Sequence, residues 1–136
     1  MPRKTDSSNP SDWLAFAESD LQGLRALAQQ ELSPELCSSK LAEVLEKILK
    51  AELIRVGWTL ERTHDLEKLA NELNARGSDL VPEVRPLANA FSEVYFADRY
   101  PGFDLEDPDW PNFRLQLGQV ETVFQKVKQR VSSAKG

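Results

Sequence analysis

Residues 41–66 read LAEVLEKILKAELIRVGWTLERTHDL, and this stretch decides the fold. At about 100° per residue its apolar side chains form a band much wider than a surface helix needs. The band contains Leu41, Val44, Leu45, Ile48, Leu49, Ala51, Leu53 and Val56, and the polar residues Glu43, Glu46, Lys47 and Lys50 fall together on the opposite side. We therefore predict the central helix of an all-α bundle, with those four polar residues on its solvated side.

Two charged residues interrupt the apolar band of this helix. Glu52 and Arg55 project into its middle, and their (i, i+3) spacing allows them to pair. One interpretation is an internal ion pair. Such a pair need not add net stability, but removing only one of its two residues would destabilise the protein. The other is that this end of the helix lines a cleft together with Arg62 and His64.

Start and stop signals on either side predict four further helices. The first begins between Asn9 and Asp12 and runs to about Gln30. The central helix begins after a Ser33 cap with Pro34 in its first turn, and it ends at Gly57. A short helix follows a Thr63 cap and ends at Gly77. The others cover about 80–98, where Pro86 should bend the helix or delay its start, and from Asp109 or Trp110 onward.

The predicted fold is thus an all-α, up-and-down bundle of four long helices plus one short helix. We expect a disordered N-terminal tail at 1–10, the bundle at 11–132 and a C-terminal tail at 133–136. The 136 residues suffice for one core, and 40% apolar with 29% charged residues is typical of a folded soluble chain.

Composition narrows the functional classes. A net charge of −5 argues against broad binding to a nucleic-acid backbone but does not exclude a local basic cleft. Cys37 is the single cysteine, so no internal disulfide can form, and we interpret it as a small buried hydrophobe in a reducing compartment. No apolar run is long enough for a membrane span, and residues 1–9 lack the hydrophobic core of a secretory signal. We expect a cytoplasmic protein.

His64 is the only histidine, so any imidazole chemistry must pass through it. One Cys and one His cannot build a zinc site of the Cys/His type, and no glycine-rich phosphate loop is present. We expect neither a metal nor a cofactor. His64 is either a structural residue whose ring bonds across the bundle or part of a site. The positive charges of Lys126, Lys128, Arg130 and Lys135 suit the C-terminal end of the last helix, with RNA binding as the less favoured interpretation.

Several segments, in this order, resemble a known family. They are Trp13 with Asp20-Leu21, then Glu46-Lys47-Ile48-Leu49-Lys50-Ala51, then Arg62-Thr63-His64-Asp65-Leu66, and finally Arg99-Tyr100-Pro101-Gly102. Over residues 11–132 the chain is similar to the HEPN domain (higher eukaryotes and prokaryotes nucleotide-binding), in its small stand-alone prokaryotic form. The resemblance implies a helical bundle that commonly forms homodimers. It also implies a minimal nucleotidyltransferase as partner protein.

Many HEPN proteins are ribonuclease toxins with an Arg-x(4–6)-His motif, in which the histidine acts on the ribose 2′-hydroxyl and the arginine steadies the phosphate. This chain departs from that pattern, because Asp104 follows Arg99 at the x(4) spacing where a histidine is required. His64 lies too close after Arg62 and too far after Arg55 to restore the motif.

Our leading hypothesis is therefore a non-catalytic, dimeric HEPN-like module. It would bind a nucleotide or a nucleotidyltransferase-like partner, as in a toxin–antitoxin-type system. The candidate ligand-binding residues are Glu52, Arg55, Arg62, His64, Arg99 and Tyr100. Two alternatives stay open: a metal-independent endoribonuclease toxin with a rearranged site, for which His64, Arg62 and Arg99 are the catalytic candidates, and a purely structural interaction bundle.

Overall fold

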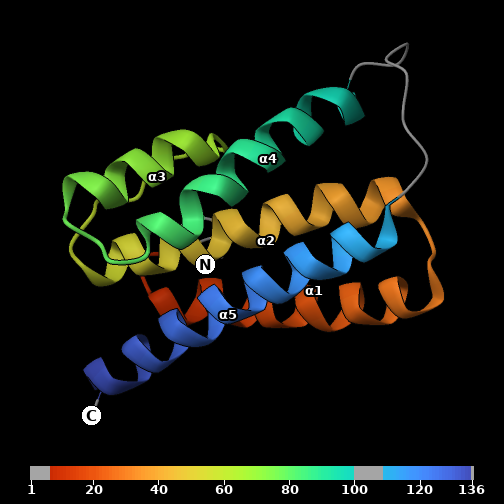
Figure 1. Cartoon of the computed structure of the whole chain (residues 1–136). Helices are drawn as coiled ribbons and strands as arrows, with labels where there is room; N and C mark the ends of the chain where they lie inside the picture. Colours follow the sequence, from red (N-terminus) through yellow and green to blue (C-terminus); the bar gives the residue numbers. More distant parts are fainter. Residues whose placement is uncertain (1–6, 100–108, 136) are drawn as a thin grey trace.

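The computed structural model describes residues 7–99 and 109–135, and within these ranges the chain forms five helices and no strand (Figure 1). The helices are α1 (Pro10–Gln30), α2 (Pro34–Arg55), α3 (Leu66–Ala75), α4 (Val81–Arg99) and α5 (Trp110–Lys135). The short α3 has 10 residues and the others have 19 to 26. The prediction of four long helices plus one short helix is confirmed.

Helix α2 is the centre of the bundle, because it packs against all four of the other helices. In Figure 1 it runs between α1 and α5 on one side and α3 and α4 on the other. Its predicted apolar band is buried except at Val56, which is exposed just after the helix ends. The apolar seam of α5 is buried as well, and it consists of Phe113, Leu117, Val120, Phe124, Val127 and Val131. Among the described residues, no helix is long and apolar enough to cross a membrane.

The first helix begins with Pro10, one residue inside the predicted tail. The Asn9 side chain caps it by accepting a hydrogen bond of 3.0 Å from the backbone N–H of Ser11. Trp13 Nε1 donates to the carbonyl of Ser7 at 2.8 Å, so Ser7 lies against α1. Residues 1–6 are outside the described ranges. At the other end, α5 continues to Lys135, beyond the predicted boundary at 132.

Two side chains that we predicted to cap helices do not do so, although Ser33 does occupy the N-cap position of α2. Ser33 precedes α2 in a left-handed conformation with φ of 52°, and its side chain makes no capping hydrogen bond. Asp65, not Thr63, caps α3 by accepting hydrogen bonds from the backbone N–H groups of Glu67 and Lys68 at 3.0 and 3.2 Å. The Thr63 hydroxyl instead accepts from the N–H of Asp65 at 3.2 Å and fixes the turn before the cap.

The end of α2 directs the next segment back over the helix. Gly57 has φ of 96°, which favours glycine because it has no Cβ. The N–H of Gly57 donates to the carbonyl of Ile54 at 3.0 Å, and that of Trp58 donates to Leu53 at 2.9 Å, which is a Schellman motif. Trp58 is buried and anchors the connection that carries residues 62–65 to α3.

Helix α4 starts at Val81, so Pro86 lies inside it and does not delay its start as one of our two alternatives had it. The ring of Pro86 removes an N–H that would donate to the carbonyl of residue 82 within the helix.

Candidate functional site

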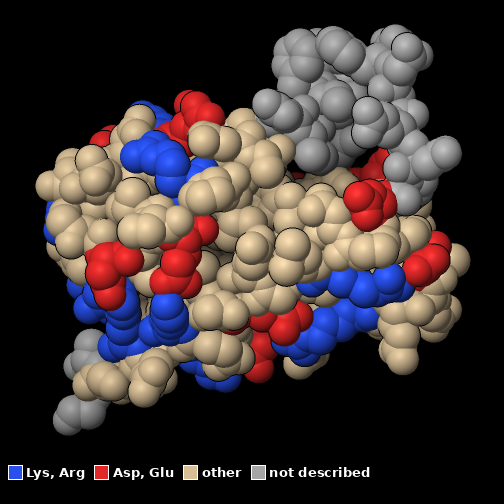
Figure 2. Space-filling model, viewed as in Figure 1, with Lys and Arg blue, Asp and Glu red and all other residues tan. Residues whose placement is uncertain are grey.

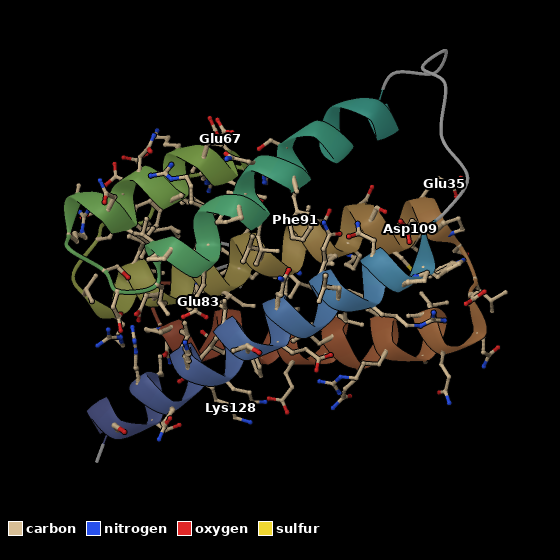
Figure 3. All side chains as sticks on the ribbon, viewed as in Figure 1. Glu35, Glu67, Glu83, Phe91, Asp109 and Lys128 are labelled. Carbon is tan, nitrogen blue, oxygen red and sulfur yellow. The ribbon has the colours of Figure 1, made fainter. Side chains whose placement is uncertain are left out.

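A pocket of about 430 Å³ lies between α2, the segment 62–66 and α4. Its walls include Glu46 of α2, Arg62 and His64 of the connection, and Leu66 and Phe91, both of which are buried in the core. Figure 3 shows Phe91 on the side of α4 that faces α2. The pocket thus joins an apolar wall to several ionisable side chains, which is the usual composition of a small-molecule site.

Glu46 and Lys50 are buried on α2, with exposed fractions of 9% and 3%, and the prediction that they lie on a solvated side is wrong. The helical pattern could not reveal that the connection to α3 would return across this face. Lys50 Nζ is 3.0 Å from Glu46 Oε2 and also lies 5.2 Å from the centre of the Trp13 ring. Within the described residues, every fully buried side-chain nitrogen and oxygen has a hydrogen-bond partner.

Glu46 also holds the histidine. His64 Nδ1 is 3.0 Å from Oε1 and 3.2 Å from Oε2 of Glu46, while 73% of the imidazole side chain is exposed. An ionised carboxylate can only accept hydrogen bonds, so the Nδ1 of His64 carries the proton in this pair. In a neutral ring, Nε2 then has a lone pair that accepts a hydrogen bond or a proton from a ligand.

Local structure keeps Arg62 and His64 together at this pocket. Thr63 and Asp65 form the turn and the cap at the start of α3, and Leu66 is buried as its first residue. Arg62 is exposed and lines the same pocket as His64. An arginine and an oriented histidine at one opening can bind a phosphate and donate to or accept from the attached group.

Glu52 and Arg55 lie elsewhere, in a charged network at the C-terminal end of α2. Arg55 Nε is 2.5 Å from Glu52 Oε1, so the predicted ion pair is present. Arg130 of α5 joins it, with Nη1 2.6 Å from Glu52 Oε2 and Nη2 2.8 Å from Asp79 Oδ2. Glu52 and Arg55 line a separate hollow with Arg130, so they do not form one cleft with Arg62 and His64.

Hydrogen bonds within this network shift the pKa values of Arg130 and Asp79. Burial lowers the pKa of Arg130, but the hydrogen bonds to Glu52 and Asp79 outweigh that effect, so the pKa is raised overall. The hydrogen bond from Arg130 lowers the pKa of the Asp79 carboxyl. The sequence did not predict that Asp79 and Arg130 join this network. Glu52 and Arg130 are 78 residues apart, and an ion pair over that distance leaves no local pattern in the sequence.

The remaining sequence candidates fall partly outside the described ranges. Arg99 is the last residue of α4, but its side chain is not among those described, and Tyr100 lies outside the described residues altogether. In the described part of the chain, no group of three or more His, Cys, Asp and Glu side chains could hold a metal ion.

These observations define a five-helix bundle domain whose pocket is built from two of the sequence segments quoted above, joined by the contact between Glu46 and His64. The family model of the HEPN domain matches residues 10–130 of the chain. The protein therefore belongs to the HEPN domain family. No curated protein and no solved structure matches the chain significantly.

Proposed function

We propose that this HEPN domain protein is a non-catalytic module that binds a nucleotide in the pocket between α2, the segment 62–66 and α4. It acts as a homodimer with a nucleotidyltransferase-like protein as its partner. The observation that carries the proposal is the contact of Glu46 with His64 Nδ1 at 3.0 Å, which orients the histidine beside Arg62 at a pocket of about 430 Å³.

The chemistry of the walls suits a nucleotide. The volume falls in the range of roughly 300–1,000 Å³ that is usual for small-molecule sites. The guanidinium of Arg62 can donate a forked pair of hydrogen bonds to a phosphate. Phe91 and Leu66 offer an apolar wall for a base, and the Nε2 of a neutral His64 accepts from an N–H or hydroxyl group of the ligand.

The chain departs from the motif of the catalytic members of the family. In the HEPN ribonuclease toxins four to six residues separate the arginine from the histidine, whereas here Asp104 follows Arg99 after four residues. A carboxyl group donates a proton near neutral pH only if its pKa is strongly raised. The proposed dimer and the proposed partner protein both rest on membership of the family.

Calorimetric titration with the four ribonucleoside monophosphates tests the binding role. We expect binding of at least one of them, weakened about tenfold or more in Arg62→Ala and in His64→Ala, because each loses a hydrogen bond to the ligand. Arg25→Ala is the matched control, since this exposed arginine pairs with Glu121 far from the pocket and its loss should change nothing. A strictly monomeric protein that binds no nucleotide and no nucleotidyltransferase encoded beside it would refute the proposal.

A second candidate function is a metal-independent endoribonuclease, and the pairing of His64 with a buried carboxylate favours it. In this reaction the Nε2 of His64 would take the proton of a ribose 2′-hydroxyl, and Arg62 would hold the phosphate. RNA cleavage in the presence of EDTA that disappears in His64→Ala would support this function. Intact RNA after incubation at high protein concentration would exclude it.

A further inference from the structure

A further polar hollow lies next to the one that Glu52 lines, where the C-terminal end of α2 meets the C-terminal part of α5. Its volume is about 640 Å³, and it is lined by Arg55, Asp79, Lys126, Gln129, Arg130 and Ser133. Three of these side chains are cationic and one is a carboxylate, in a protein whose net charge is −5. Basic side chains gather over this part of α5 in Figure 2.

A buried carboxylate holds two of the cations in place. Glu52 is 1% exposed, and it accepts from Arg55 Nε at 2.5 Å and from Arg130 Nη1 at 2.6 Å. Arg55 is held through Nε and lines the hollow. Cations that are fixed before a ligand arrives lose little conformational entropy on binding it.

The third cation approaches from α5. Lys126 pairs with Glu83 of α4, and nearly half of its side chain stays exposed. Figure 3 shows Glu83 between α4 and α5. The Gln129 amide and the Ser133 hydroxyl add neutral donors on the same face of α5, because residues 126, 129, 130 and 133 follow one another at spacings of three, one and three.

We propose that this hollow binds a phosphate chain, either inorganic pyrophosphate or the triphosphate of a nucleotide. The three lining cations pair with Glu52, Glu83 and Asp79, but of these carboxylates only Asp79 lines the hollow, so a ligand with several negative charges meets more cations than carboxylates there. The hollow is also larger than a single phosphate needs. Asp79 is the one lining carboxylate, and its bond to Arg130 is what a phosphate would replace. The site is separate from the pocket of His64, since Glu46 and Arg55 lie about 14 Å apart along α2.

Calorimetry at low and at physiological salt, first with pyrophosphate and then with a nucleoside triphosphate, tests this inference. We expect Lys126→Ala and Arg55→Ala each to weaken binding about tenfold, and Asp79→Asn to strengthen it severalfold because it removes the competing carboxylate. Lys128→Ala is the matched control, since this lysine lies on the same helix, pairs with Glu18 and does not line the hollow. Binding of pyrophosphate would identify the phosphate chain itself as the ligand, and binding of the nucleoside triphosphate without any binding of pyrophosphate would identify a nucleotide.

Two results would overturn the inference. One is that neither ligand binds at millimolar concentration, and the other is that binding is the same in Lys126→Ala and Asp79→Asn as in the wild type. The outcome is independent of the proposed function, because pyrophosphate has no base and its binding should persist in Arg62→Ala and His64→Ala. Binding of the triphosphate that is lost in Arg62→Ala but kept in Lys126→Ala would place it in the other pocket and also refute this inference.

Discussion

Replacing Glu52 with glutamine removes a buried negative charge that two arginines share. The side chains have nearly the same size, so Glu52→Gln leaves no cavity and isolates the electrostatic contribution. In the wild type one carboxylate oxygen accepts from Arg55 at 2.5 Å and the other from Arg130 at 2.6 Å. Glutamine keeps one acceptor and turns the other into an amino group that faces a guanidinium donor.

The size of the effect follows from the burial of the three side chains. A hydrogen bond to a charged group contributes about 1.5–3 kcal/mol, and removing one partner of a buried pair costs about 3–5 kcal/mol. Both arginines keep 28% of their side chains exposed, so water can solvate them after the change. We therefore expect the free energy of unfolding to fall by about 2–4 kcal/mol. At about 4 °C per kcal/mol for a chain of this size, Tm falls by roughly 8–16 °C.

Urea denaturation followed by circular dichroism measures this change, with Glu18→Gln as the control. Glu18 pairs with Lys128 at 3.3 Å, and both side chains are more than 40% exposed, so its loss should change the free energy of unfolding by no more than about 0.5 kcal/mol. In the Glu52→Gln background, Arg130→Gln should cost less than in the wild type, because the two residues are coupled. A loss below about 1 kcal/mol without coupling to Arg130 would refute the reasoning.

Two further predictions concern groups buried along α2. Burial raises the pKa of the Cys37 thiol, so the unfolded chain releases the thiol proton at a lower pH than the folded protein does. Wild type should therefore lose stability relative to Cys37→Ala as the pH rises above about 8.5, and an equal loss in both would contradict this. Nitrogen-15 NMR of the neutral His64 ring should show the proton on Nδ1 in the wild type and a mixture of tautomers in Glu46→Gln, whereas the same tautomer in both would show that Glu46 does not position the ring.

The helices were predictable because their signals are local. The apolar band of α2 and the apolar seam of α5 repeat within a few residues, and burial of one side of an amphipathic helix is enough to place it in a bundle. Helix caps were less predictable, because several side chains near the start of a helix can accept hydrogen bonds from its first N–H groups. Thr63 and Asp65 are both residue types that can cap a helix, and the backbone conformation places Asp65 at the N-cap position of α3.

The polar side of α2 could not be predicted from its own sequence. A helical pattern separates apolar from polar residues but does not tell whether the polar side meets water or other charged groups. Glu46 and Lys50 are buried because Trp13 packs near the ammonium group and His64 returns to the carboxylate from 18 residues away. The sequence motifs identified His64 and Arg62 as candidates, but the carboxylate that orients the histidine was predicted to be solvated.

The two buried glutamates of α2 explain how one helix organises two separate sites. Glu46 and Glu52 are six residues apart, so at about 100° per residue they project from the helix in directions about 120° apart. Each therefore meets a different set of neighbours: Glu46 meets His64, and Glu52 meets Arg55 and Arg130. No residue lines both the pocket beside His64 and the large hollow beside Arg130. A ligand in either place would therefore touch only its own set of side chains, while α2 and α4 connect the two places, since Phe91 of α4 lines the pocket and Glu83 of α4 pairs with Lys126.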